Sequence, residues 1–121
     1  MAAPSPNLLW KVGSGFAGAG IMAGAFGAHG LKSRGIAPES IASFQTGSHY
    51  LVFNGLALLL LSLHPRFSVH RFAGPAIAGG AFLFSGSIFA LVLNRDRFKF
   101  LGPITPLGGV LMIAGYVSMV L

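Results

Sequence analysis

Seven polar side chains stand in or beside the long apolar stretches of this sequence, and they offer amide, imidazole and hydroxyl groups. This candidate buried polar cluster consists of His29, Gln45, His49, Asn54, Ser85, Ser87 and Thr105. Gln45 and His49 are four residues apart, as are Tyr50 and Asn54, so each pair shares a face if the segment is helical. An unpaired polar group in hydrocarbon is strongly unfavourable, so these side chains should face one another rather than lipid. We therefore expect them to converge toward one half of the molecule.

Three kinds of role are open to such a cluster. The favoured role is a network of hydrogen bonds between helices that fixes their register. The alternatives are a site for a quinone or a lipid headgroup, and a path for protons or small solutes. A metal site is not expected, because His29 and His49 would supply two imidazoles with no thiol or carboxylate beside them.

The chain lacks the groups that most enzymes use. It has no Cys, and its two carboxylates, Glu39 and Asp96, lie in segments that we expect to be loops. Asp96 stands between Arg95 and Arg97, whose charges favour the ionised carboxylate. Gly13–Gly18 matches a dinucleotide-binding fingerprint, but that motif needs a preceding strand and a βαβ unit. We therefore expect no enzymatic activity, no catalytic residue and no cofactor.

The distribution of charge defines the elements that must position these side chains. Only 8% of the residues are charged and the mean hydropathy is +0.77, whereas about a quarter of the residues in soluble domains are charged. The charges leave four long uncharged stretches, and a helix of about 20 apolar residues crosses a bilayer. The predicted spans are about 8–29, 44–63, 72–93 and 103–121. The sequence thus predicts one domain, residues 1–121, with an all-α membrane fold: an up-down bundle of four transmembrane helices.

The basic residues suggest which partners the chain contacts. A net charge of +6 would suit nucleic acid in a soluble protein, but here the charges are spread over loops, which favours contact with anionic lipid. We expect the lipid bilayer as partner and no nucleic acid. One side of the bundle should hold Lys11, Arg66 and Arg71. The other should hold Lys32, Arg34, Arg95, Arg97 and Lys99, and should face the cytoplasm or its equivalent.

Small residues mark where helices should pack. Gly20, Gly24 and Ala28 recur at intervals of four, and close backbone approach is a main source of helix packing in membranes. The further predicted packing residues are Gly79, Gly86, Gly108 and Gly115. Packing within the chain is the favoured interpretation, and an interface with a second copy or with another membrane protein is the alternative. Gly24→Leu should destabilise the bundle more than Gly13→Leu, which lies nearer the membrane surface.

Four segments together resemble a known family, and the resemblance covers nearly the whole chain from about Leu9. The segments are residues 24–31 (GAFGAHGL), 44–61 (FQTGSHYLVFNGLALLLL), 84–93 (FSGSIFALVL) and 101–109 (LGPITPLGG). They are similar to the domain-of-unknown-function family numbered 423, which includes animal transmembrane protein 256 and small bacterial inner-membrane proteins. The resemblance implies a four-helix integral membrane protein and implies no activity.

The leading functional hypothesis is a small integral membrane protein without enzymatic activity that packs beside, or assists assembly of, a larger inner-membrane complex. The alternative is a transporter of small solutes or protons, or a membrane protein that binds a quinone or a lipid. The expected location is a bacterial-type inner membrane or the mitochondrial inner membrane.

Overall fold

The protein is helical throughout the part described by the computed structural model, residues 5–121, where no strand occurs. The elements are α1 (Pro6–Phe26), the π-helical turn η1 (Gly27–Leu31), α2 (Pro38–Leu63), the 3-10 turn η2 (Phe67–Val69), α3 (Ala73–Leu93), α4 (Arg95–Phe98), the 3-10 turn η3 (Lys99–Leu101) and α5 (Ile104–Val120). The predicted all-α membrane fold is confirmed, with four long helices near the four expected ranges. Only the start of α2 differs much, because the helix begins at Pro38 and includes Glu39, which was expected to lie in a loop. Proline in the first turn and an acidic residue near the positive end of the helix dipole both favour that start.

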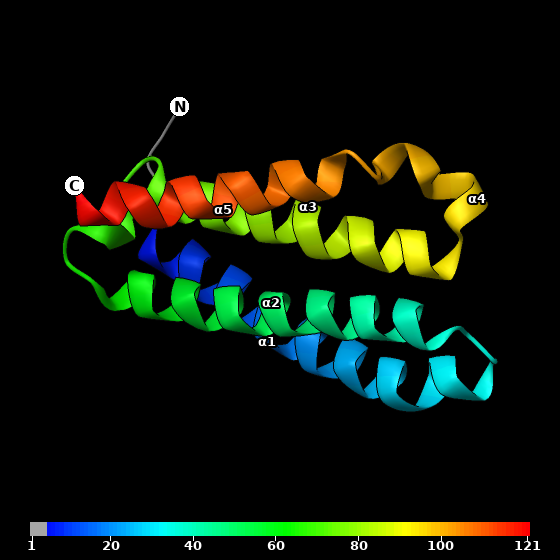
Figure 1. Ribbon diagram of the computed structural model, residues 1–121. Helices are drawn as coiled ribbons and strands as arrows, with labels where there is room; N and C mark the ends of the chain where they lie inside the picture. The colour runs from blue at the N-terminus through cyan, green and yellow to red at the C-terminus, as the bar shows by residue number, and fades with distance from the viewer. Residues whose placement is uncertain (1–4) are drawn as a thin grey trace.

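The bundle consists of two tight helix pairs (Figure 1). Helix α1 packs along α2, and α3 packs along α5, while a smaller contact between α2 and α3 joins the pairs. Successive long helices run in opposite directions, so the start of α1, the loop between α2 and α3, and the C-terminus lie at one end (Figure 1). Helix α4 lies at the opposite end.

The outer surface of the bundle is apolar enough to contact lipid. Large hydrophobic side chains such as Ile21, Leu60 and Val110 are exposed along it, and soluble monomers rarely expose extensive apolar surface of this kind. Helices α2 and α3 are each long and apolar enough to cross a membrane, and a third span results if Arg95–Leu101 and Ile104–Val120, bent by 44°, count together. Spanning by α1 stays a prediction, which its packing along α2 favours.

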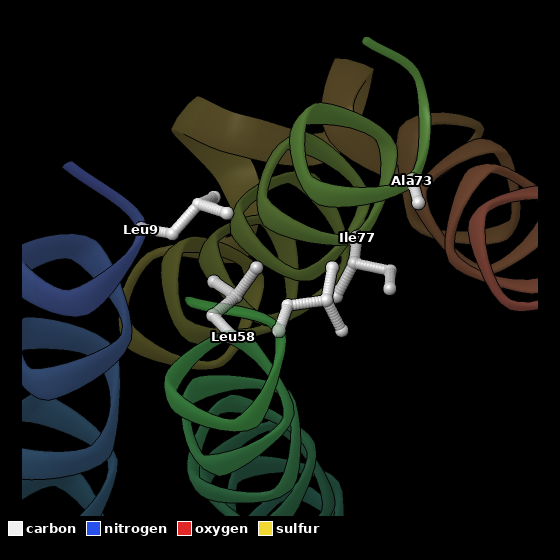
Figure 2. Packing of buried hydrophobic residues seen from close by; sticks show 5 residues of the cluster. Leu9, Leu58, Ala73 and Ile77 are labelled. Carbon is white, nitrogen blue, oxygen red and sulfur yellow. The ribbon is translucent and has the colours of Figure 1, made fainter. Parts of the chain in front are cut away.

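The hydrophobic core lies toward the end that carries the C-terminus. Leu9 from α1, Leu58 and Leu61 from α2, and Ala73 and Ile77 from α3 form one buried cluster there (Figure 2). The cluster ties the three helices together where the loop between α2 and α3 has to turn.

Glycine allows the backbones of α1 and α2 to touch. A Cβ atom added at Gly13 would lie 2.6 Å from the carbonyl oxygen of Gly55, and one added at Gly55 would lie 2.6 Å from the amide nitrogen of Ala17. Gly20 is equally close to Val52. At Gly24 the nearest atom is the Ser48 hydroxyl, at 2.8 Å, which is a side chain that can move. Because Gly13 occupies the tighter site, the structure favours the opposite order, in which Gly13→Leu destabilises the bundle more than Gly24→Leu.

The predicted packing position Ala28 does not face α2. The π-helical turn changes the phase of the helix, so Gly27 lies against Phe44 and Gln45 while Ala28 is exposed. A spacing of four residues holds only while the helix remains α-helical.

Helices α3 and α5 also touch at glycines, but on α3 the contacting glycine is one residue away from the predicted one. A Cβ atom at Gly108 would lie 2.5 Å from the amide nitrogen of Phe84, and one at Gly115 would lie 2.8 Å from Ile77. On α3 the contact belongs to Gly80, which would meet the Gly108 carbonyl at 2.7 Å. Gly79 and Gly86 were predicted instead. Within residues 5–121, a Cβ atom added at Gly79 would have one neighbour, at 3.7 Å, and one added at Gly86 would have none within 4 Å. Adjacent helical residues differ by about 100° around the axis, so a one-residue error selects another face.

Candidate functional site

The predicted polar residues are distributed over several helix interfaces rather than gathered in one cluster. Gln45 bonds between α2 and α1, and Ser85 bonds between α3 and α2. Ser87 and Thr105 pair between α3 and α5, and Asn54 bonds between α2 and α5. The prediction of a single shared site is therefore corrected. Each interface has its own polar contact.

Two side chains of α2 bond to the backbone of α1. The Gln45 amide donates to the Gly24 carbonyl at 3.0 Å, and the buried Ser48 hydroxyl donates to the Gly20 carbonyl at 2.7 Å. Both acceptors are glycines of α1 that lie against α2, so close packing and hydrogen bonding occur at the same residues. Ser48 was missed by the sequence analysis. Its position three residues after Gln45, on the same helix face, was the available signal.

Two serines of α3 reach in different directions. Ser85 is fully buried, and its hydroxyl donates to the Gly47 carbonyl of α2 at 2.7 Å. The hydroxyl of Ser87 pairs with that of Thr105 on α5 and also donates to the Phe84 carbonyl at 3.0 Å. Together these contacts connect α3 with both of its neighbours.

Asn54 connects α2 with α5 near the middle of the bundle. Its side chain is 2% exposed. The amide nitrogen donates to the Tyr50 carbonyl at 2.7 Å and to the Met112 sulfur at 3.2 Å. The amide oxygen accepts a hydrogen bond from the Tyr116 hydroxyl. Tyr116 and Met112 were not predicted, although a tyrosine hydroxyl inside an apolar helix generally requires a polar partner.

The two predicted histidines lie outside this set of contacts. His29 is exposed on the π-helical turn, and His49 is exposed on α2, with its ring 6.2 Å from that of Phe53. In the described part of the chain, no three His, Cys, Asp or Glu residues are grouped so that they could hold a metal ion. The imidazoles therefore do not meet the buried amide and hydroxyl groups.

The buried polar atoms are all used. Among residues 5–121, every buried side-chain nitrogen or oxygen has a hydrogen-bond partner. Several of these bonds join different helices, as expected for contacts that fix helix register. This arrangement can hold the bundle together.

A groove of about 320 Å³ lies between α2 and α5. The rings of Tyr50, Phe53 and Phe84 line it together with Asn54 and Tyr116. Tyr50 and Phe84 are in contact, with ring centroids 4.9 Å apart. The groove is therefore aromatic, and its polar groups are the Asn54 amide and the hydroxyls of Tyr50 and Tyr116.

Comparison with known proteins identifies relatives across most of the chain. Residues 23–109 match the model of a family described as protein of unknown function (DUF423). A UPF0382 membrane protein of Schizosaccharomyces pombe is 40% identical over 99 residues, covering 79% of this chain and 84% of the relative. UPF0382 membrane proteins of Staphylococcus aureus and Staphylococcus epidermidis are 39% and 37% identical over 100 residues, covering 81% of this chain and 80% of each relative. No solved structure matches.

Proposed function

Because this chain belongs to the DUF423 family of proteins of unknown function, we propose that it is a non-enzymatic integral membrane protein that packs beside a larger membrane complex. The observation that carries this proposal is an uncovered face of small residues on α1. Within residues 5–121, a Cβ atom added at Gly15 or Gly18 would meet no atom within 4 Å. Ser14, Ala19 and Ala25 are exposed as well, and the larger side chains exposed on the same side are Ile21 and Met22.

The uncovered glycines do not lie against another helix in the part of the chain that the structure describes. Gly13, Gly20, Gly24 and Gly27 all lie against α2. A glycine inside a helix is unfavourable by about 1 kcal/mol relative to alanine, and Gly15 and Gly18 gain no close contact in return. A transmembrane helix of a partner subunit could approach the backbone of α1 closely at these two positions. The saturated polar contacts support a packing role rather than a catalytic one.

The proposal is tested by the mass of the complex that the chain forms in its native membrane. A tagged chain solubilised in mild detergent should migrate on a native gel well above the monomer. Gly15→Leu/Gly18→Leu should abolish that band, because two leucines would hold the partner helix away, while Gly86→Leu, at an equally open glycine on α3, should retain it. Migration of the parent chain as a lone monomer, or an unchanged band in the double variant, would contradict the proposal.

We place this complex in an inner membrane, of bacterial or mitochondrial type. Support comes from the organisms of the relatives, which include bacteria and a fungus. Fractionation of cells that express the tagged chain would test the location. Recovery in any other membrane would contradict it.

The groove between α2 and α5 favours a second function, binding of a neutral ring-bearing amphiphile of the quinone class. Its aromatic walls can stack on a flat ring, and the free acceptor capacity at the Tyr116 oxygen can receive a hydroxyl. A short-chain benzoquinol, the reduced form whose hydroxyl can donate to that oxygen, should raise the melting temperature of the purified chain. Gly109→Leu, which fills the groove, should remove that shift. A Gly86→Leu control should keep it, and equal shifts in all three proteins would indicate partition into detergent only.

A further inference from the structure

A separate cavity of about 400 Å³ lies where the start of α2, the end of α3 and the start of α5 meet. This is the end of the bundle that carries α4 (Figure 1). Its polar wall consists of the Arg95 side chain and four hydroxyl residues, Ser40, Ser43, Thr46 and Thr105. None of the residues that line it, among those described, is a carboxylate. The cavity thus combines one cation with hydroxyl groups.

Arg95 differs in its surroundings from two other arginines, Arg34 and Arg97. Arg34 and Arg97 lie over the rings of Phe26 and Phe98, at 5.3 and 5.8 Å from their centroids. Arg95 instead lines the cavity. A guanidinium group matches the oxygens of a phosphate in a forked geometry, so it is the side chain of choice for that anion.

The hydroxyl groups can turn toward such an anion. Those of Ser43 and Thr46 donate to carbonyls one turn earlier in α2, at 3.2 and 3.1 Å, on an exposed surface. Hydroxyl hydrogens rotate to suit their partners, so both can be redirected when an acceptor enters the cavity. The positive end of the α2 dipole, which begins at Pro38, also attracts an anion, although the Glu39 carboxylate in the same turn offsets part of that attraction.

The remaining wall of the cavity is apolar and lies deeper along α3. It is formed by Ile88, Leu91 and Val92. Ile88 lies five residues before Leu93, the last residue of α3, which is roughly 7.5 Å along a helix. The cavity therefore combines a cation at the end of the bundle, hydroxyl groups along α2 and an apolar wall along α3, so one lipid molecule could place its phosphate at the cation and an acyl chain on the apolar wall.

We propose that this cavity binds an anionic phospholipid, with its phosphate at Arg95 and an acyl chain along Ile88, Leu91 and Val92. A free phosphate would share the polar chemistry. The apolar wall distinguishes the lipid, because a small water-soluble anion would leave Leu91 and its neighbours uncovered. The site is independent of the packing face on α1 and of the groove between α2 and α5.

Lipid binding to the purified full-length chain in neutral detergent tests the proposal. Native mass spectrometry would compare phosphatidylglycerol with phosphatidylcholine of identical acyl chains. Phosphatidylglycerol should bind more tightly, and Arg95→Gln should weaken it about tenfold, or about 1.4 kcal/mol. The matched control Arg97→Gln, two residues away on the same short helix, should weaken it less than twofold. Ser43→Leu should also abolish binding, because it fills the cavity and leaves every charge in place.

Three outcomes would overturn the proposal. Equal weakening by Arg95→Gln and Arg97→Gln would indicate general surface charge rather than a site. Equal binding of the two lipids would exclude recognition of the anionic headgroup. Displacement of phosphatidylglycerol by an equal concentration of glycerol 3-phosphate would identify a site for a soluble anion. Ser43 is exposed, so its variant also reports on the cavity if Arg95→Gln fails to fold.

Discussion

The tight helix pairs and the space between α2 and α5 are held by different physical means. Within each pair, glycines such as Gly55 and Gly108 let two backbones touch. Between α2 and α5 the described residues form no extensive contact, and the Asn54 side chain bonds to Tyr116 across an aromatic groove. Backbone contact leaves no room for a ligand, whereas large rings hold helices apart and leave a groove. The pairs are thus suited to stability and the space between them to binding.

The largest effects should follow substitutions that separate the paired backbones. Gly55→Leu and Gly108→Leu would each force a side chain into a neighbouring main chain that cannot move aside. We expect each to destabilise the bundle by about 3 kcal/mol, the upper part of the usual range for overpacking. Gly18→Leu on the open face of α1 is the control and should change stability little. The measurement is thermal unfolding in detergent, and similar melting of all three variants would mean that the helices are not packed in these pairs.

A smaller difference should separate two glycines of the same helix. Gly13→Leu meets the Gly55 carbonyl, while Gly24→Leu meets the Ser48 hydroxyl, which can rotate away but then loses its bond to Gly20. Both should destabilise, by about 1–3 kcal/mol, with Gly13→Leu the more severe. The same unfolding assay ranks them. The reverse order would contradict the close approach of Gly13 to the backbone of α2.

The sequence could predict the helices but not which residues of each helix contact its partner. Charge-free stretches predicted the four helices, because the length of a span and the exclusion of charge are properties of one segment. Whether Gly79 or Gly80 touches α5 depends on a rotation of about 100°, which the partner helix decides. The π-helical turn that exposes Ala28 is likewise invisible in the composition of residues 27–31.

The sequence could predict that buried polar side chains bond between helices, but not which atoms they bond to. Buried serines such as Ser85 were expected to bond between helices, and their acceptors are backbone carbonyls, which every residue carries. No sequence pattern therefore selects Gly47 as the acceptor. Asn54 and Tyr116 are 62 residues apart, so their contact follows from how the two pairs dock.

The contact between α2 and α5 should be weaker than the packing within the pairs. Asn54→Leu leaves the Tyr116 hydroxyl unpaired in an apolar groove, so we expect a loss of about 1–3 kcal/mol. Tyr116→Phe should cost a similar amount, because it leaves the buried amide oxygen of Asn54 without its donor. In a double-mutant cycle the coupling energy should be about 0.6–1.7 kcal/mol, the range measured for hydrogen bonds between membrane helices. A coupling energy of zero would mean that the bond does not hold the two pairs together.

The smallest effects should distinguish two residues of α2 that the sequence placed on one face. Gln45 turns toward α1 and donates to Gly24, whereas His49 is exposed and lies beside Phe53. Four helical residues advance by about 40° beyond one full turn, which is enough to carry His49 past the α1 interface. Gln45→Ala should therefore destabilise by about 0.6 kcal/mol, the mean for such bonds, and His49→Ala by less than about 0.5 kcal/mol. A larger loss of stability in His49→Ala would indicate a partner on the exposed side of α2. That side would then replace the glycine face of α1 as the surface to test for a neighbouring subunit.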